Sequence, residues 1–242
     1  MKHFGLIGKS LKHSFSKKYF DEKFKAFGLL DFDFRLIEIP DIEDLPEKVK
    51  EYELSGFSVT IPYKEAIIPF CHSLSPEAEK ICAVNCVKVT DNGWVGYNTD
   101  YVGFRDTLPL DDLAKGGTAI VFGTGGASRA IIHVLSLLGL EIINVSTSSK
   151  KGTIHYQALT DQIIKKALIL VNCTPLGTFP EVDKAVPINF SAIHKGQICY
   201  DLVYNPDQTK FLRLSAQQGA RTINGMKMLI IQAEEAWKIW NN

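Results

Sequence analysis

The feature that most constrains the fold of this 242-residue sequence is a glycine-rich turn at residues 123–126. Before the turn, residues 118–122 form a short apolar run that resembles a strand. After it, residues 130–138 have the apolar periodicity of a helix that ends at Gly139, and residues 141–146 resemble a second strand. Strand, glycine turn, helix and strand within about 30 residues are the arrangement that a dinucleotide-binding βαβ unit requires.

The glycines of this turn have separate roles in that interpretation. Gly123 allows the sharp turn, and Gly125 lets the backbone approach a pyrophosphate, which the N–H groups of the helix start then bind. Ser128 departs from the usual pattern, because the third position of the fingerprint is normally Gly or Ala. A plain strand-to-helix connection can have the same glycines, but the flanking strands and helix favour a dinucleotide site.

The end of the second strand indicates which dinucleotide is bound. An NAD site carries Asp or Glu about 20 residues after the glycines, where the carboxylate binds the ribose 2′-hydroxyl. This sequence has Ser146-Thr147-Ser148-Ser149-Lys150-Lys151 there, without a carboxylate. Hydroxyls followed by two lysines suit a 2′-phosphate, so we predict NADP as the cofactor. A polar turn with solvated lysines would contain the same residues without binding a cofactor.

Composition and charge exclude several other classes of protein. The 27 Lys and Arg residues balance the 27 Asp and Glu residues, so no net field favours nucleic acid or an acidic membrane. No apolar run reaches the roughly 20 residues that span a bilayer, and the N-terminus lacks the core of a signal peptide. We therefore predict a cytoplasmic protein with no nucleic acid and no membrane as partners.

The five cysteines and six histidines do not form a metal-binding pattern. The sequence has no Cys-x-x-Cys pair and no His-Glu-x-x-His arrangement, and Cys82 and Cys86 lack a matching second pair. Reduced and mostly buried thiols are the better interpretation, and we predict no metal.

Strand-like and helix-like segments alternate three times before the glycine turn. We expect strands at residues 3–7, 33–39 and 56–60, and helices at residues 17–27, 43–52 and 75–81. The apolar side of the first of these helices carries Tyr19, Phe20, Phe24 and Phe27. This alternation lacks a glycine fingerprint, and it predicts an open α/β domain separate from the dinucleotide unit. A strand at residues 83–89 and a hairpin turn at residues 91–93 follow, and residues 108–117 are the best candidate for a linker.

The alternation continues after the dinucleotide unit to the end of the chain. We expect further strands at residues 168–173, 197–203 and 221–223, and helices at residues 207–218 and 226–240. The last helix has an apolar stripe that leaves Gln232 near one edge.

Several polar residues near the N-terminus have both a structural and a functional interpretation. Ser14 and Ser16 stand next to a helix start, where Ser16 either caps the helix or, with Ser14, binds a carboxylate. Lys64 follows a strand end, where open α/β sheets place ligands, although a lone lysine there is usually a solvated charge. Asn85 interrupts an apolar strand and needs a hydrogen-bonding reason, either structural or for a ligand. Asp100 suits a helix cap and a catalytic role equally well.

Motifs spread over nearly the whole sequence, taken in order, resemble the shikimate dehydrogenase family. They are His13-Ser14-x-Ser16, Val59-Thr60-Ile61-Pro62-Tyr63-Lys64, Ala83-Val84-Asn85, Asn98-Thr99-Asp100-x-x-Gly103-Phe104, Gly123-x-Gly125-Gly126-x-x-x-Ala130, Asn172-x-Thr174-Pro175-x-Gly177, Asp201-Leu202-Val203-Tyr204-Asn205-Pro206, and Gly225-x-x-Met228-Leu229-x-x-Gln232-Ala233. Seven or more motifs in this order are far more specific than any one of them.

The resemblance implies a two-domain α/β fold. Residues 1–104 and 225–242 would form an open α/β substrate-binding and catalytic domain, to which the C-terminal helix returns. Residues 105–224 would form an inserted Rossmann domain that binds NADP, with the chemistry in the cleft between the domains. The implied activity is the reversible NADPH-dependent reduction of 3-dehydroshikimate to shikimate, in the shikimate pathway of aromatic amino acid biosynthesis. The implied assembly is a monomer or a homodimer.

The resemblance also assigns roles to individual residues. Lys64 and Asp100 would be the catalytic pair, because a lysine ammonium can stabilise a developing alkoxide and donate a proton, and a nearby carboxylate orients it and tunes its pKa. The implied substrate contacts are Ser14 and Ser16 to the carboxylate and Thr60, Asn85, Tyr204 and Gln232 to the ring substituents. The implied cofactor contacts are Gly123, Thr124, Gly125, Gly126, Ala127, Ser146, Thr147, Ser148, Lys150, Thr174, Leu202, Gly225 and Met228.

Cofactor preference, substrate range and turnover have open alternatives. The family usually has Asn-Arg-Thr after the second Rossmann strand, whereas this sequence has Ser146-Thr147-Ser148, so Lys150 or Lys151 would have to replace the arginine. Related paralogues that also oxidise quinate share most of the motifs. A protein that senses a dinucleotide or metabolite without turnover is the alternative to an enzyme, and the presence of both Lys64 and Asp100 argues against it.

Overall fold

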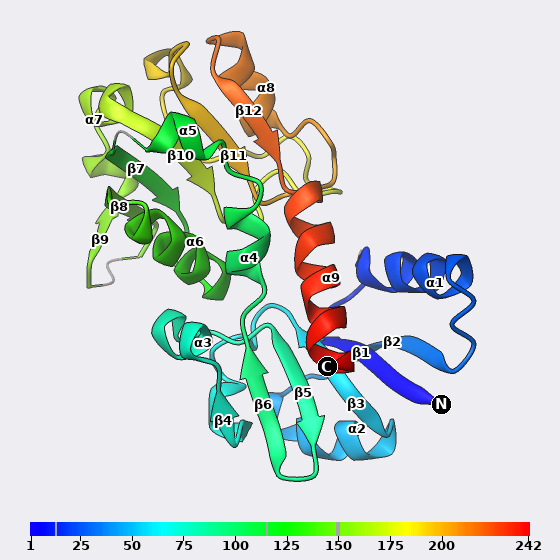
Figure 1. Cartoon of the computed structure of the whole chain (residues 1–242). Helices are drawn as coiled ribbons and strands as arrows, with labels where there is room; N and C mark the ends of the chain where they lie inside the picture. The colour runs from blue at the N-terminus through cyan, green and yellow to red at the C-terminus, as the bar shows by residue number, and fades with distance from the viewer. Residues whose placement is uncertain (13, 115, 149–150) are drawn as a thin grey trace. The chain divides into compact units, whose positions relative to one another are not determined.

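A computed structural model of the chain describes residues 1–12, 14–114, 116–148 and 151–242. The chain divides into two compact units (Figure 1). The first unit comprises residues 1–99 and 233–242, and the second unit comprises residues 100–232. Each unit has a six-stranded sheet among its described residues. The functional domains expected from the sequence, residues 1–104 with 225–242 and residues 105–224, stay a prediction.

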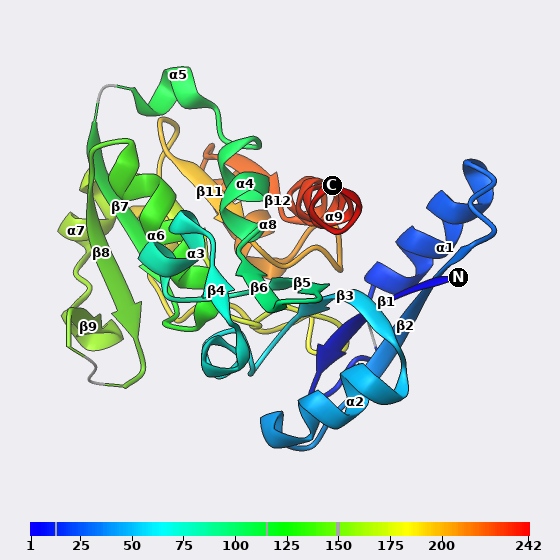
Figure 2. The same cartoon turned by 60° about the horizontal axis from the view of Figure 1, so that its bottom comes forward.

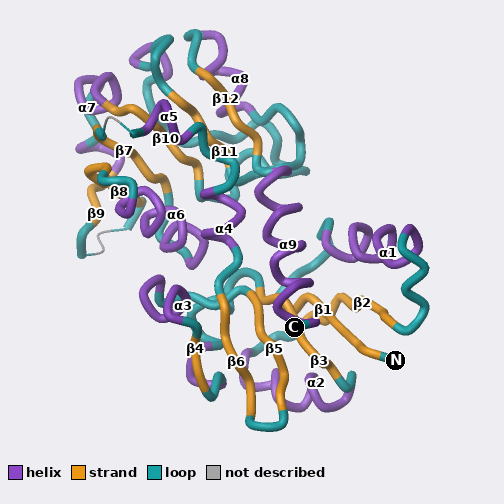
Figure 3. Tube along the Cα trace, viewed as in Figure 1, coloured by secondary structure: helices purple, strands orange, loops and turns teal. Residues whose placement is uncertain are grey.

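The sheet of the first unit has the strand order β2-β1-β3-β5-β6-β4 (Figure 3). Its strands are β1 (Lys2–Gly8), β2 (Phe32–Glu38), β3 (Leu54–Val59), β4 (Ser73–Leu74), β5 (Cys86–Thr90) and β6 (Gly93–Tyr97). β1 runs parallel to both of its neighbours, whereas β5 is antiparallel to β3 and to β6. The expected hairpin is confirmed, because Thr90 pairs with Gly93 and leaves Asp91 and Asn92 as a two-residue loop.

Each face of this sheet has its own hydrophobic core, because successive side chains of a strand point to opposite faces. Phe4 and Leu6 of β1 belong to an aromatic cluster that also contains Trp240 from the C-terminal residues. Ile7 belongs to a second cluster, which contains Leu45 and other apolar residues. The helical segments of this unit are α1 (Ser16–Ala26), α2 (Leu45–Glu51) and α3 (Pro76–Ile81), with 3-10 turns at η1 (Ile42–Asp44) and η2 (Ile68–Phe70).

Two predictions in the first unit are wrong in detail. The strand expected from residue 83 begins at Cys86, and Asn85 just before it uses its side chain to bind Thr99. Phe27, which the helical periodicity places on the apolar side of α1, is 72% exposed. The reason is that α1 ends at Ala26, and Gly28 then reverses the chain with a φ of 63°. Phe20 and Phe24, in contrast, are buried as predicted.

The sheet of the second unit is parallel throughout its described strands and has the order β12-β11-β10-β7-β8-β9. The strands are β7 (Gly117–Phe122), β8 (Leu140–Ser146), β9 (Thr153–His155), β10 (Ala167–Asn172), β11 (Ile198–Asp201) and β12 (Arg221–Asn224). The chain starts in the middle at β7, adds β8 and β9 on one side, and then adds β10 to β12 on the other. The strand order therefore reverses between β7 and β10, which is the point where such sheets bind dinucleotides.

Helices pack along this parallel sheet, as crossover connections require. α6 follows the glycine turn and lies along β7 and β8 (Figure 2). The apolar cores of the unit contain mainly aliphatic residues, among them Ile120, Val121 and Val171. The helical segments are α4 (Asp100–Arg105), α5 (Leu110–Leu113), α6 (Gly126–Leu137), α7 (Asp161–Lys166), α8 (Lys210–Gln217) and α9 (Met226–Asn241), with 3-10 turns at η3 (Tyr156–Ala158) and η4 (Phe190–Ala192).

Most predicted segments of the second unit are present, but several bounds differ. The helix expected from residue 130 begins at Gly126, at the end of the glycine turn. The strand expected to reach residue 203 ends at Asp201, whose carboxylate accepts a hydrogen bond from the N–H of Val203. The helix expected from residue 207 begins at Lys210, because Thr209 caps it by accepting from the N–H of Leu212. Within the ranges that the structure describes, none of the helices has the length and apolar character needed to cross a membrane.

Candidate functional site

The glycine turn after β7 is shaped to receive a ligand. Gly123 has a φ of 106°, in the left-handed region that favours glycine, and its N–H binds the carbonyl of Val145 at 2.9 Å. Gly125 precedes α6, and a Cβ placed on it would meet no other atom within 4 Å. No side chain caps α6 among the described residues. The N–H groups of its first turn are therefore suited to bind an anion.

Ser128 is explained by its own contacts. Its side chain is 1% exposed, and its hydroxyl donates to the carbonyl of Gly125 at 2.7 Å. A small polar side chain thus replaces the Gly or Ala of the usual fingerprint and fastens the helix start to the turn. The departure seen in the sequence does not weaken the turn.

The carboxyl end of β8 lies beside this turn and carries the predicted 2′-phosphate contacts. Asn144 of β8 donates to the carbonyl of Gly123 at 2.8 Å, which fixes the turn to the strand. Ser146 is buried and its hydroxyl accepts from the N–H of Ser148 at 3.1 Å, whereas Thr147 and Ser148 are exposed. Lys150, the remaining predicted contact in this segment, lies outside the described residues.

The other predicted cofactor contacts gather at the ends of β10, β11 and β12. Thr174 donates its hydroxyl proton to the side-chain oxygen of Asn172 at 2.6 Å, and the N–H of Leu202 binds the carbonyl of Asn172 at 2.9 Å. A Cβ on Gly225 would stand 2.3 Å from the carbonyl oxygen of Leu202, so only glycine permits this approach. Met228 is 6% exposed and belongs to the apolar core. The structure thus brings Thr174, Leu202 and Gly225 to one edge of the sheet.

In the first unit, the predicted carboxylate-binding serines lie at the start of α1. Ser16 is the first residue of the helix, so the expectation that it is the N-cap is wrong. The hydroxyl oxygen of Ser14 accepts from the N–H of Ser16 at 3.2 Å, which is a capping role. A hydroxyl has a proton to donate as well as two lone pairs, so this bond leaves Ser14 able to donate to an anion. His13, in the same motif, lies outside the described residues.

Thr60 follows β3 and lies next to the start of the serine-containing loop. Its N–H binds the carbonyl of Ile7 at 2.9 Å. A Cβ on Gly8 would stand 2.6 Å from the side chain of Thr60, so the two segments touch. The structure therefore brings Thr60 close to the residues that lead into Ser14.

Residues 83–85 hold the segments that carry the predicted catalytic pair. The N–H of Val84 binds the carbonyl of Lys64 at 2.7 Å. The side-chain oxygen of Asn85 accepts from the N–H of Thr99 at 2.6 Å, and its side-chain nitrogen donates to the Thr99 hydroxyl at 3.1 Å. Asp100 is the next residue along the chain and the first of α4. The hydrogen-bonding reason that the sequence required for Asn85 is thus at least partly structural.

Two predicted ring contacts belong to the second unit. Tyr204 follows β11 and is half-buried, two residues beyond Leu202. Gln232 lies in α9, and its side-chain nitrogen donates to the carbonyl of Leu229 at 2.9 Å. A Cβ on Gly103 would stand 2.6 Å from the carbonyl oxygen of Met228, which explains the glycine in the motif that begins at Asn98. Glycine at residue 103 lets α4 pack closely against α9.

Sequence reasoning missed the residues that hold the turns of the second unit. Asn144, Asp201 and Asn224 each bind a turn that carries predicted cofactor contacts. Burial raises the pKa of Asp201 to about 6, although hydrogen bonds from Thr209, Val203 and Asn172 favour its charged form. A polar residue at the end of a strand is the signal that could have found Asp201 and Asn224, whereas Asn144 lies within β8.

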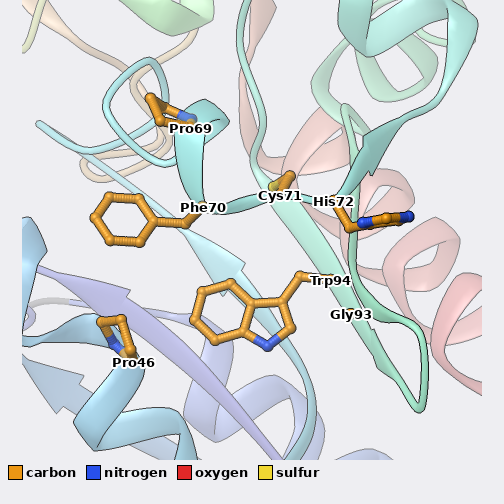
Figure 4. A pocket seen from close by; sticks show the side chains of 7 residues that line it. All are labelled: Pro46, Pro69, Phe70, Cys71, His72, Gly93 and Trp94. Atoms are coloured by element: carbon orange, nitrogen blue, oxygen red, sulfur yellow. The ribbon is translucent and has the colours of Figure 1, made fainter.

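A surface hollow of about 410 Å³ in the first unit is lined by none of the predicted site residues (Figure 4). Its lining residues are Pro46, Pro69, Phe70, Cys71, His72, Gly93 and Trp94. In the part of the chain that the structure describes, no group of three or more His, Cys, Asp and Glu side chains is placed to hold a metal ion.

The parallel sheet with a reversed strand order, the open glycine turn and the helix start without a side-chain cap define a dinucleotide-binding α/β protein. The comparisons with known proteins agree with this class and narrow it. Residues 6–87 match the model of the shikimate dehydrogenase substrate binding domain. The shikimate dehydrogenase (NADP(+)) of Caldicellulosiruptor saccharolyticus is 36% identical over 99% of this chain and 92% of its own length.

Solved structures give the same result. Shikimate dehydrogenase 1 from Peptoclostridium difficile has a TM-score of 0.84 and 33% identity, covering 100% of this chain and 92% of that one. Shikimate 5-dehydrogenase from Thermus thermophilus, in complex with NADP(H) and shikimate, has a TM-score of 0.84 and 28% identity, covering 99% of this chain and 93% of that one. The chain belongs to the shikimate dehydrogenase family.

Proposed function

We propose that this protein is an NADP-dependent shikimate dehydrogenase, which reversibly reduces 3-dehydroshikimate to shikimate. The observation that carries the proposal is that a coenzyme turn of the right geometry and every motif of the predicted catalytic machinery occur in one chain of this family. The enzyme would act in the cytoplasm as a monomer or homodimer. Its balanced charge provides no net field that would attract nucleic acid or an acidic membrane.

The residues around the glycine turn fit NADP. The open position at Gly125 and the first turn of α6 would hold the pyrophosphate. The exposed hydroxyls of Thr147 and Ser148 would receive the 2′-phosphate, with a lysine from the segment that follows. The family's arginine is missing there, so we expect a preference for NADP that rests on hydroxyls and lysine charge. When bound, the coenzyme supplies the hydride.

The protein's own part in the chemistry is to position the substrate and to move a proton. Ser14 and Ser16 would bind the substrate carboxylate, while Thr60, Asn85, Tyr204 and Gln232 would bind the ring hydroxyls. The Lys64 ammonium would donate a proton to the carbonyl oxygen as it becomes an alkoxide. Asp100 would orient that ammonium and stabilise its charged form. In the reverse direction the Lys64 amine would accept the proton.

The test is a spectrophotometric assay of the purified chain with each combination of shikimate or quinate and NADP or NAD. We expect reduced nicotinamide to form fastest with shikimate and NADP. Faster turnover with quinate would move the protein to the quinate-oxidising paralogues. Binding of both ligands without turnover under any combination would identify a sensor instead of an enzyme.

A further inference from the structure

Three neighbouring strands of the second unit end in a row of polar residues. Asn172 ends β10, Asp201 ends β11 and Asn224 ends β12. They are also partners across the sheet, since Asn172 pairs with Asp201 and Asp201 pairs with Asn224. We call these three residues the edge row. The edge row lies at the carboxyl ends of the strands, where open α/β sheets bind their ligands.

The first link of the edge row joins Asn172 to Asp201. The side-chain nitrogen of Asn172 donates to Asp201 Oδ1 at 2.9 Å. Its side-chain oxygen faces the following turn, where it accepts from the N–H of Thr174 at 3.0 Å and from the Thr174 hydroxyl at 2.6 Å. A single side chain therefore fastens the Thr174 turn to the neighbouring strand.

Asp201 extends the connection to the next turn and to a helix. Besides Asn172, its Oδ1 accepts from the N–H of Val203 at 3.0 Å, and its Oδ2 accepts from the Thr209 hydroxyl at 2.6 Å. Thr209 in turn caps α8 through the N–H of Leu212 at 3.2 Å. The carboxylate thus fixes the segment that contains Leu202 from both ends.

Asn224 closes the edge row. Its side-chain nitrogen donates to the carbonyl of Asp207 at 2.7 Å and to that of Val203 at 3.3 Å. Its side-chain oxygen accepts from the N–H of Met226 at 2.8 Å, at the start of α9. The same turn contains Gly225, which touches the carbonyl of Leu202. All three post-strand turns on this side of the sheet are joined in one network.

The position of the network in the sheet indicates which half of the coenzyme it serves. A dinucleotide bound at the reversal point spans the strand ends on both sides of it. The glycine turn and the Ser146–Ser148 segment occupy the β7 and β8 side, where the 2′-phosphate and the adenosine belong. The nicotinamide half therefore extends over the ends of β10, β11 and β12.

We propose that Asn172 and Asp201 are positioning residues for the nicotinamide half of NADP, which they act on through the Thr174 and Leu202 turns. The inference rests on the proposed function, since it assumes that NADP is the coenzyme. A carboxylate with 0% exposure is a costly way merely to stabilise a sheet edge, because burial opposes its charge. Three hydrogen bonds that converge on it from separate segments are suited to fixing geometry.

The experiment compares two asparagines that each bind a post-strand turn. Asn172 and Asn144 lie on opposite sides of the point between β7 and β10 where the strand order reverses. Asn172→Ala and Asn144→Ala are titrated, as whole chains, with NADP and with adenosine 2′,5′-bisphosphate, which lacks the nicotinamide half. We expect Asn172→Ala to weaken NADP binding roughly tenfold and to leave the affinity for the bisphosphate within about twofold. Asn144→Ala loosens the glycine turn and should therefore lower the affinity for both ligands by the same factor.

The outcomes separate this inference from the proposed function. The positioning role would be overturned if Asn172→Ala lowered the affinity for NADP and for the bisphosphate equally, or lowered neither. Failure of the unchanged chain to bind either ligand would overturn the coenzyme assignment itself and this inference with it.

A second variant keeps the test decisive where Asn172→Ala folds poorly. Thr209→Val removes the hydroxyl that binds Asp201, at a residue away from the predicted cofactor contacts. This variant should bind NADP about threefold more weakly and should keep its affinity for adenosine 2′,5′-bisphosphate. Thr209→Ser, which restores the hydroxyl, should return the NADP affinity to that of the unchanged chain. A Thr209→Ser variant as weak as Thr209→Val would contradict the role assigned to the carboxylate.

Discussion

The two units solve the problem of positioning functional groups in different ways. In the first unit a mixed sheet is covered on one face by aromatic rings, such as the stacked Phe20 and Phe34 with centroids 4.4 Å apart. Trp240, near the C-terminus, lies against Gly56, and its ring N–H donates to the carbonyl of Val87 at 3.0 Å. The last residues of the chain are therefore part of the core of the unit formed by the first residues.

The second unit has a mainly aliphatic core and keeps its polar connections at one edge of the sheet. Asn144, Asn172, Asp201 and Asn224 each bind a turn after a strand. In the first unit the predicted functional groups instead lie at the start of α1 or on loops whose backbone is bound to Ile7 or to residues 83–85. The difference teaches that the predicted substrate contacts of the first unit depend on loop anchoring, whereas the predicted coenzyme contacts of the second unit depend on polar side chains of its strands.

The largest expected effect tests the predicted catalytic pair, of which Lys64 belongs to the first unit and Asp100 to the second. Lys64→Ala should lower turnover by about 10²–10⁴-fold, the usual worth of general acid–base assistance, while shikimate and NADP still bind. Asp100→Asn should also lower turnover strongly. Because the two groups act as one, the double variant should be scarcely slower than the worse single variant. Multiplicative losses would show independent roles, and near-normal turnover of Lys64→Ala would refute the mechanism.

The next largest effect concerns folding stability and pH in the second unit. Burial raises the pKa of Asp201 from its ordinary 3.8 to about 6 in the folded chain. A raised pKa favours the folded state below pH 4 and disfavours it progressively as the pH rises through 6. The difference between the folded and the unfolded pKa corresponds to roughly 3 kcal/mol in the free energy of unfolding.

Asp201→Asn removes this titration and retains the size of the side chain. The free energy of unfolding of the unchanged chain, minus that of the variant, should therefore fall by roughly 2.5 kcal/mol between pH 4 and pH 7. Urea titrations at several pH values measure this difference. A pH-independent difference would mean that Asp201 titrates normally.

A smaller effect separates coenzyme binding from stability at two glycines. The new Cβ in Gly125→Ala would meet no atom within 4 Å. The free energy of unfolding of this variant should therefore lie within about 1 kcal/mol of that of the unchanged chain, since a change of N-cap residue usually costs no more. Its methyl group occupies the approach of the pyrophosphate, and NADP affinity should fall about tenfold. Gly225→Ala would place its Cβ 2.3 Å from a carbonyl oxygen and should destabilise the fold instead. Unchanged NADP binding by Gly125→Ala would place the pyrophosphate elsewhere.

The smallest expected effect concerns cofactor preference. Replacing Lys150 and Lys151 together by alanine removes charge from the segment after β8 and should raise the Michaelis constant for NADP about fivefold. The constant for NAD should hardly change, because NAD lacks the 2′-phosphate. An equal change for both coenzymes would mean that the 2′-phosphate is recognised by other residues.

Local patterns are sufficient to predict most strands and helices, but tertiary hydrogen bonds change their bounds. β7, α6 and β8 follow from apolar periodicity, and Gly123 and Gly139 mark the ends of β7 and α6. The shortened β11 and the late start of α8 depend on Asp201 and Thr209, which meet only in the folded chain. The sequence patterns do not predict β9 and α7 at all.

The candidate site shows the same limit. Gly123 and Gly125 can be found from their spacing alone, because backbone conformation is a local property. The roles of Ser14, Lys64 and Asp100 come from a family resemblance, since single polar residues have equally good structural explanations. The edge row cannot be predicted from the sequence, because strand order determines that Asn172, Asp201 and Asn224 are neighbours.

The most direct test of the central claim, that Ser14 of the first unit serves the substrate and that the linked turns of the second unit serve the coenzyme, is a cross-titration of Ser14→Ala and Asn144→Ala. Each variant is titrated separately with shikimate and with NADP. We predict that Ser14→Ala weakens shikimate binding about tenfold or more, the worth of a hydrogen bond to an anion, and leaves NADP affinity unchanged. Asn144→Ala should do the reverse. This division would be contradicted if both variants bound both ligands more weakly, or if Ser14→Ala lost thermal stability but no affinity for shikimate.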